Sequence, residues 1–362
     1  MKMISIMLAF APLTVHAAAT PADSARGAEL FTSLSCIQCH AINGKGGSAA
    51  PDLGQRIDRD FTPASLAATM WNHAPGMWTA MRERKVAPGE LTVQGAMDLF
   101  AYFYAARFFD KPGDAARGKR VFESRRCSEC HGLTEKKFLA AKPVAQWESL
   151  GDPVNLTDAM WNHAASMRGE FARRKLSWPE LTSQDLTDLL VYLRNLPEER
   201  NLPVRIAISS GSDGQSLFES KGCAACHHDL RLGRMTLTDI AAAMWNHAPK
   251  MALNPPNLSA EEMRQIVSYL WAERFFKDEG HSAAGRRVFA SKHCATCHYD
   301  GSKVAPKLTG KSLTSAGMVS ALWRHGPGML DRIRADGLRW PRFSGRDMAN
   351  LIAYLNSREG AK

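Results

Sequence analysis

Every cysteine of the chain belongs to one short motif, Cys-x-x-Cys-His, which occurs four times. The 362 residues contain eight cysteines, and none is left over. The copies are Cys36-Ile37-Gln38-Cys39-His40, Cys127-Ser128-Glu129-Cys130-His131, Cys223-Ala224-Ala225-Cys226-His227 and Cys294-Ala295-Thr296-Cys297-His298. Chance does not place all cysteines in pairs three residues apart, each followed by histidine. The pattern therefore indicates one chemical task that is carried out four times.

The spacing of the motif fits covalent attachment of haem. Two thiols three residues apart can each form a thioether with a vinyl group on one edge of a porphyrin, and the adjacent histidine then binds the iron. A structural zinc site or a disulfide framework would not require histidine at the same offset four times. The sequence predicts four covalently bound haem c groups. Their thioethers form at Cys36, Cys39, Cys127, Cys130, Cys223, Cys226, Cys294 and Cys297, and their proximal iron ligands are His40, His131, His227 and His298.

The N-terminal residues have the pattern of a secretory signal peptide. Lys2 gives a positive start, residues 4–13 are mostly apolar, and Val15 and Ala17 stand at the positions before a cleavage site. We expect residues 1–17 to be removed and the mature protein to be periplasmic, because bacteria attach haem covalently outside the cytoplasm. No later apolar run approaches the roughly 20 residues of a membrane-spanning helix.

The surroundings of the motif repeat with it. The first cysteines lie 91, 96 and 71 residues apart, and each is preceded by glycine at nine residues and phenylalanine at five. These two residues lie four apart and share one helix face, where the glycine lets another helix approach and the ring fills space beside the haem. The pairs are Gly27 and Phe31, Gly118 and Phe122, Gly214 and Phe218, and Gly285 and Phe289.

Two further helices are expected in each copy. The last one has apolar residues at helical spacing and one tyrosine, which predicts a core-facing helix. Its tyrosines are Tyr102, Tyr192, Tyr269 and Tyr354. The middle one carries a tryptophan, a histidine and a methionine, as in the segment Met70-Trp71-Asn72-His73-Ala74-Pro75-Gly76-Met77.

This arrangement resembles the class I cytochrome c domain from about residue 24 to residue 358. The resemblance implies an all-α fold of four tandem cytochrome c-like helical domains, each wrapped around one covalent haem. In that family a proline carbonyl after the haem motif orients the proximal imidazole. Pro51, Pro143 and Pro306 fit this role, whereas the third copy has no proline between His227 and Pro249.

Proline- and glycine-rich segments set the expected domain boundaries. The predicted division is a signal peptide over 1–17 and cytochrome c domains over 22–110, 113–200, 208–278 and 281–358, of which the third is shortened. Short linkers suggest that the domains they join pack as neighbours, and the long linker near 195–214 hints at a two-plus-two arrangement.

Two residues in each copy could bind the sixth position of the iron, because a histidine and the methionine four residues after it face one side of a helix. We favour methionine, which the family uses and which raises the potential. A proline such as Pro75 or Pro327 would end the helix just before it. The favoured ligands are Met77, Met167, Met251 and Met329, and the alternatives are His73, His163, His247 and His325.

The third copy is expected to cover its haem least. Its two histidines are 20 residues apart, against 33, 32 and 27 in copies one, two and four, and its basic segment is replaced by residues 254–256. We predict that the third haem is the most exposed and does not have the highest potential.

Charge and ligand pattern favour an electron carrier. The formal net charge is +10, and the basic clusters after the methionines are either solvated helix faces or a surface that steers an acidic redox partner. A haem enzyme needs an open iron and an acid–base group, and no copy differs in that way, so no catalytic residue is expected. We predict a periplasmic tetrahaem cytochrome that serves redox proteins, without a nucleic-acid partner. The alternatives are a multihaem enzyme of peroxidase or sulfur-compound dehydrogenase type, and a cytochrome subunit of a membrane quinol-oxidising or terminal oxidase complex.

Overall fold

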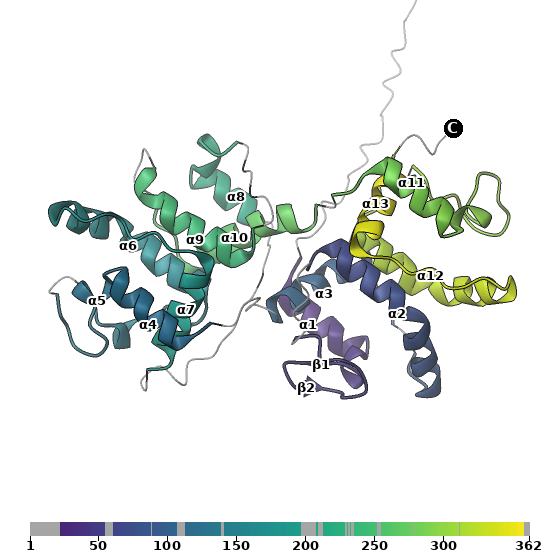
Figure 1. Cartoon of the computed structure of the whole chain (residues 1–362), viewed down its shortest axis with the longest axis horizontal. Helices are drawn as coiled ribbons and strands as arrows, with labels where there is room; N and C mark the ends of the chain where they lie inside the picture. Colours follow the sequence, from purple (N-terminus) through teal and green to yellow (C-terminus); the bar gives the residue numbers. More distant parts are fainter. Residues whose placement is uncertain are drawn as a thin grey trace, which may run out of the picture.

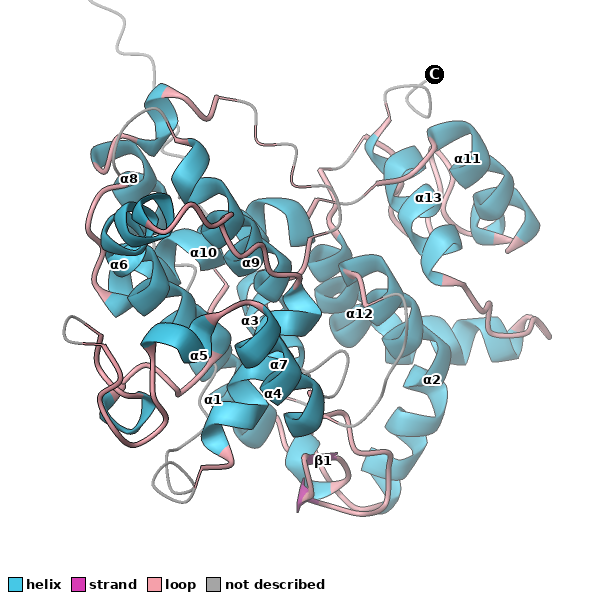
Figure 2. Cartoon of the chain, turned by 60° about the vertical axis from the view of Figure 1, so that its left-hand side comes forward, coloured by secondary structure: helices cyan, strands magenta, loops and turns pink. Residues whose placement is uncertain are grey.

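The computed structural model describes most of the chain. The described residues are 22–54, 61–87, 89–106, 113–138, 141–196, 208, 213–228, 230, 232, 235–251, 255–277, 279–310 and 312–357. The predicted signal peptide, residues 1–17, lies outside them. The fold is all-α, as predicted, and Figure 2 shows helices joined by loops with one short hairpin.

Each haem motif lies in a unit of three longer helices. The first unit contains α1 (Ser24–Ser33), η1 (Cys36–Gln38), α2 (Pro63–Glu83) and α3 (Val93–Ala106), with a hairpin of β1 (Ala41–Ile42) and β2 (Lys45–Gly46). The strands are antiparallel, with Ala41 opposite Gly46. The second unit contains α4 (Ala115–Ser124), α5 (Cys127–Cys130), η2 (Val144–Gln146), α6 (Pro153–Arg173) and α7 (Ser183–Arg194).

The third unit contains α8 (Asp213–Ser220), η4 (Cys223–Ala225), α9 (Leu237–His247), η5 (Ala248–Lys250) and α10 (Ala260–Phe275). The fourth contains α11 (Ser282–Ser291), η6 (Cys294–Thr296), α12 (Ser315–Ala335) and α13 (Gly345–Asn356). Polar side chains begin many of these helices by accepting hydrogen bonds from first-turn amides, as Asp23, Thr62 and Ser344 do for α1, α2 and α13. In the part of the chain that the structure describes, no helix has the length and apolarity needed to cross a membrane.

The first and last helices of each unit cross at the predicted glycine. A Cβ at Gly27 would meet the backbone of Asp98 in α3, so only glycine permits this approach. Phe31 packs against Tyr102 one turn later, with ring centroids 5.8 Å apart. The same crossing recurs at Gly118, Gly214 and Gly285. The sequence prediction for this pair of helices is confirmed.

The middle helix does not end at its proline in units one and four. Pro75 lies inside α2 and Pro327 lies inside α12, and both helices continue for two further turns. The expectation that these prolines end the helix is therefore wrong. It holds only in the third unit, where α9 ends at His247 and a 3₁₀ turn follows.

Pro75 instead frees a carbonyl group. A proline has no N–H to donate to the residue four positions earlier, which here is Trp71. The Trp340 indole of the fourth unit donates to the Trp71 carbonyl oxygen at 2.9 Å. The proline thus creates an acceptor for a contact between units.

The four units pack as two pairs. One hydrophobic core combines units one and four, and a second combines units two and three. Helix α2 packs against α12 and α13, and α6 packs against α9 and α10. Figure 1 shows these pairs as two lobes, with α4 to α10 in one and α1 to α3 with α11 to α13 in the other.

The arrangement is two plus two, as the long linker suggests, but the pairs are not those joined by short linkers. The expectation that units one and two, or three and four, pack as neighbours is wrong. The apolar faces of the middle helices decide the pairing, and a linker of any sufficient length allows it.

Candidate functional site

The chain makes the same turn before each haem motif. The residue that precedes the first cysteine has a left-handed backbone, with φ of 63°, 65°, 80° and 60° at Ser35, Arg126, Gly222 and His293. The amide of the motif histidine then donates to the carbonyl of the first cysteine, at 2.9 Å for His40. A single helical turn of this kind brings the two thiols and the imidazole together.

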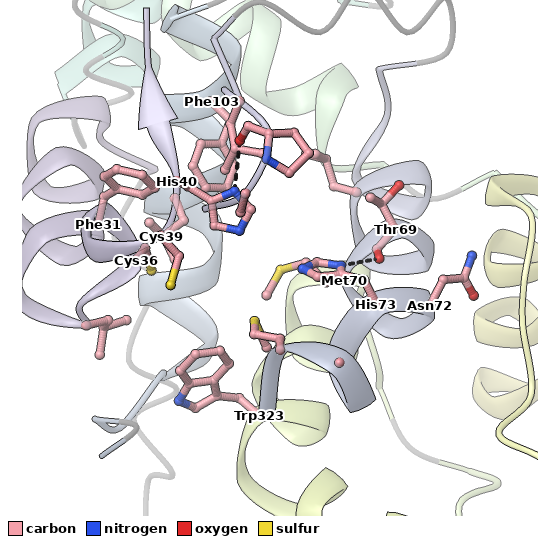
Figure 3. Close-up of a pocket in the computed structure, with 18 of the residues that line it drawn as sticks. Phe31, Cys36, Cys39, His40, Thr69, Met70, Asn72, His73, Phe103 and Trp323 are labelled. Atoms are coloured by element: carbon pink, nitrogen blue, oxygen red, sulfur yellow. Dashed lines mark hydrogen bonds between the residues drawn. The ribbon is translucent and has the colours of Figure 1, made fainter. Parts of the chain in front are cut away.

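A cavity of about 870 Å³ lies between this turn and α2 in the first unit. Its walls include Cys36, Cys39 and His40 from the motif, His73 and Met77 from α2, and Phe31 and Phe103 from α1 and α3. Figure 3 shows the thiols and His40 on one side of this space and His73 on the other. The volume falls within the range of roughly 300–1,000 Å³ that cofactor pockets have, and thiols, imidazoles and aromatic rings are the groups that a covalent haem requires.

A backbone carbonyl orients the proximal imidazole in three units. His40 Nδ1 lies 2.9 Å from the Pro51 carbonyl oxygen, and His298 Nδ1 lies 2.8 Å from that of Pro306. Both prolines were predicted, and both are confirmed. When Nδ1 donates its proton to a carbonyl, Nε2 keeps its lone pair for a metal.

The other two units depart from this pattern. In unit two the acceptor is the carbonyl of Lys142, at 3.1 Å, so the role predicted for the Pro143 carbonyl passes to the residue before it. In unit three, the described residues provide no hydrogen bond to the His227 ring. Cys226 is also exposed, whereas the other seven cysteines are half-buried.

The histidine of the middle helix faces the proximal histidine in units one to three. The centroids of His40 and His73 are 6.3 Å apart, and the corresponding pairs in units two and three are 6.2 Å and 5.5 Å apart. His73 Nδ1 lies 2.7 Å from the Thr69 carbonyl oxygen in its own helix. Of the described rings in unit four, His298 and His325 do not form such a pair.

The methionines predicted as sixth ligands come four residues after these histidines; Met77, Met167 and Met329 lie on the same helices, whereas Met251 follows the 3₁₀ turn η5 with an extended backbone. Met77 and Met329 pack against the core of units one and four, and Met167 and Met251 pack against the core of units two and three. All four are half-buried. In unit one both His73 and Met77 line the cavity, and the facing imidazole pairs are found in units one to three.

The protonation of the site suits metal binding and not thiol nucleophilicity. Burial lowers the pKa of His131, His163 and His227, which favours the neutral imidazole that binds metals. Burial raises the pKa of Cys36 and Cys294 to about 11, opposite to the shift of a reactive cysteine.

The other uses of paired cysteines find no support. All eight cysteines lie among the described residues, and none forms a disulfide. The described residues also contain no group of three or more His, Cys, Asp or Glu side chains that could hold a zinc ion.

Several of the basic residues after the methionines are paired within the chain. Arg173 and Arg174 both bind Glu170, with N–O distances of 2.6 Å, and these hydrogen bonds lower the pKa of Glu170 to about 2. Arg332 lies 2.9 Å from Asp336. Part of the positive charge that could steer an acidic partner is therefore neutralised locally.

Sequence reasoning missed the role of the tryptophan and asparagine that precede the middle-helix histidine. Trp71 donates to the Pro341 carbonyl at 2.9 Å, and Asn72 forms two hydrogen bonds with the backbone of Phe343. We call these two side chains the Trp-Asn pair and the bound segment of the other unit the receiving loop. The receiving loops are residues 89–92, 178–182, 255–259 and 340–344.

The receiving loops carried a signal that the sequence analysis did not use. Three of them repeat a pattern of Pro, any residue, Leu or Phe, and Ser or Thr, as in Pro179-Glu180-Leu181-Thr182. The remaining loop, in unit one, has Gly89 in place of the proline. A repeat that contains neither a haem ligand nor a core helix could have indicated a contact between units.

Two family models match the chain. The model described as cytochrome c matches residues 24–103 and 115–197, and the model described as cytochrome c oxidase, cbb3-type, subunit III matches residues 281–355. Neither match includes the motif of the third unit. No curated relative and no solved structure matches the chain.

Proposed function

Because the chain belongs to the multihaem c-type cytochromes, we propose that it is a periplasmic tetrahaem cytochrome that passes electrons between redox proteins. Its cytochrome c domains bind haem c covalently and serve haem-based electron transfer. One observation supports a total of four haems. The third unit, outside both family matches, has the same motif turn, the same helix crossing at Gly214 and the same facing histidines, His227 and His247.

The residues of each unit have distinct tasks. The two thiols hold the cofactor, the proximal histidine supplies a lone pair, and a carbonyl such as that of Pro51 fixes the direction of the ring. The middle helix covers the opposite side, and Phe31 and Phe103 exclude water. Bound haem supplies an iron that takes up and releases one electron.

For the sixth ligand we propose histidine in units one to three, at His73, His163 and His247. An imidazole nitrogen binds a transition metal at about 2 Å, so two rings on opposite sides of one iron have centroids about 6 Å apart. The separations of 6.3, 6.2 and 5.5 Å agree with this value. The sequence-based preference for methionine is kept for Met329, where no such pair forms. Three irons would then have lower potentials than the fourth.

Mass spectrometry of the exported protein tests the haem number, with four haems and no free thiol expected. Fewer haems after full maturation, or bound zinc, would refute it. The absorption spectrum tests the ligands, because the methionine–iron charge-transfer band at the red edge should have the intensity of one site. A band four times as strong would mean that methionine is the sixth ligand in all four units.

The match of unit four to an oxidase subunit favours a second candidate function, as a subunit of a membrane respiratory complex. Copurification with a membrane oxidase from solubilised membranes would support it, and recovery from the periplasmic fraction alone would exclude it. An enzyme with one open haem would show a high-spin signal, which unit four is the most suited to give.

A further inference from the structure

The two units of each lobe hold each other reciprocally. Trp71 of unit one binds the receiving loop of unit four, and the Trp323 indole of unit four donates to the Gly89 carbonyl of unit one at 2.6 Å. In the other lobe, Trp161 donates to the Pro256 carbonyl at 2.9 Å and Trp245 to the Pro179 carbonyl at 2.8 Å. The same contact is thus made in both directions in both lobes.

The Trp-Asn pair and the haem-facing residues occupy the same helix. Successive residues of an α-helix point in different directions, so Trp71 and Asn72 reach the other unit while His73 faces the cavity. One helix therefore forms a wall of its own cavity and also binds the neighbouring unit. This arrangement places the neighbouring unit directly beside the wall of the cavity.

The cavity of unit one is completed by unit four. Trp323 and Phe343 line it together with the residues of unit one, and Figure 3 shows Trp323 at the edge of this space. The Phe343 ring also lies under Lys292 Nζ, 6.0 Å from the ring centroid. Lys292 is two residues before Cys294, so Phe343 stands between the first cavity and the attachment segment of the fourth unit.

We propose, on the basis of the tetrahaem function proposed above, that the haems exchange electrons in the pairs one–four and two–three. In each exchange one reduced iron is oxidised by one electron and its partner iron is reduced, so no further reactant is needed. Phe343 and Trp323 form the contact between cavities one and four. Electron exchange falls steeply with distance, which favours transfer across a wall to which both units contribute.

A contact between the lobes connects the two pairs. Phe61 lines the first cavity and stacks on Phe275 of unit three, with centroids 6.0 Å apart. Tyr104 of unit one packs on Trp271 at 4.5 Å, and its hydroxyl accepts a hydrogen bond from the Leu237 amide at 3.0 Å. Unit one therefore contacts both unit four and unit three, which gives the order four, one, three, two.

Removing a single haem tests the pairs. The double substitution Cys294→Ala and Cys297→Ala should shift the potential of haem one, because a charged neighbour is lost, and leave haem two unchanged. The matched pair Cys127→Ala and Cys130→Ala should shift haem three and leave haem one unchanged. Site-resolved NMR of the haem methyls during a redox titration would measure both. Coupling that follows the sequence, with haem one responding to haem two, would overturn the proposal.

A milder variant avoids loss of a cofactor. Phe343→Leu introduces the residue found at the equivalent Leu91, Leu181 and Leu258, and it keeps the backbone bonds to Asn72. Exchange broadening between haems one and four should fall several-fold, whereas Tyr299→Leu, which removes an exposed ring of the same unit, should change nothing. Equal exchange rates in both variants would refute the role of Phe343. A haem count below four would refute the tetrahaem function instead.

Discussion

The two lobes differ in the side chains that join their units. In the lobe of units two and three, both Trp-Asn pairs are complete, since Asn162 binds the Leu258 backbone and Asn246 binds that of Leu181. In the lobe of units one and four, Arg324 replaces one asparagine. The difference teaches that the tryptophan sets the pairing, while the polar partner can vary.

Both lobes pack a receiving-loop tryptophan on a middle-helix tryptophan, as Trp178 packs on Trp245 with centroids 4.3 Å apart, and the lobe of units one and four adds the ring of Trp78. Trp340 stacks on Trp71 with centroids 5.2 Å apart and meets Trp78 edge-on at 5.7 Å. A Cβ on Gly326 would clash with the Trp78 ring, so this glycine makes room for it. Because the lobe of units two and three has two complete Trp-Asn pairs, we expect it to depend more on its polar contacts than the other lobe does.

The largest expected effect is at a buried ion pair in the lobe of units two and three. Arg264 lies 3.0 Å from Asp152, which is 1 % exposed. Arg264→Met should lower the free energy of unfolding of this lobe by about 3–5 kcal/mol, because a charge stays buried without its partner. Chemical denaturation measures this. The exposed pair of Lys250 with Glu180 is the control, and Lys250→Met should cost about 1 kcal/mol or less. Equal costs would mean that Asp152 is solvated.

The next effect compares the two polar partners of the tryptophans. Asn162→Ala leaves the buried backbone of Leu258 without its hydrogen bonds and should cost about 2–3 kcal/mol. Arg324→Ala removes an exposed contact to Glu90 at 3.6 Å and should cost less than about 1 kcal/mol. Thermal unfolding of both variants would measure the difference. A large loss of stability in Arg324→Ala would contradict the view that the lobe of units one and four depends little on this polar contact.

A smaller effect depends on pH. Burial raises the pKa of Asp158 to about 6, above its unfolded value near 4, with Glu262 adding to the shift. The folded chain therefore binds a proton at a higher pH than the unfolded chain, so this group should stabilise the fold as the pH falls from 7 to about 4, by about 1 kcal/mol at pH 5. Asp158→Asn should remove this rise. The equivalent Ser320 of the other lobe is neutral, and Ser320→Ala should leave the pH profile unchanged, which serves as the control.

The smallest effect concerns the haem proposed for unit three. Among the described residues, no backbone carbonyl accepts a hydrogen bond from the His227 ring, and Cys226 is exposed. A less covered iron favours its oxidised form, so this haem should not have the highest potential. A site-resolved redox titration measures it, and finding the third haem at the top would contradict the argument from coverage.

The sequence was sufficient to predict the units but not their partners. The motif, the crossing glycines and the tyrosine helices are local patterns with a fixed offset from Cys36 or its equivalents, and each follows from helix geometry. The pairing depends on which tryptophan reaches which loop, and no local pattern encodes that choice. Linker length is a poor guide to which units pack together, because it limits only how far two units can separate.

The proline in the middle helix shows the same limit within the site. Pro75 was expected to end the helix and bring Met77 towards the iron. The helix instead continues, and the freed Trp71 carbonyl is bound by Trp340, which is 269 positions later in the chain. The local rule was correct about the missing hydrogen bond, but a distant residue determined its consequence.

The pairing of the first unit with the last also sets an order of assembly. The wall that Trp323 and Phe343 contribute to the first cavity is synthesised last, so the first motif stays uncovered until the end of the chain has been made. Contacts of such long sequence separation form slowly, whereas units two and three can close as soon as both have emerged. Cys36 and Cys39 therefore stay open for the longest time, which gives the thioether-forming machinery its widest interval at the motif that appears first.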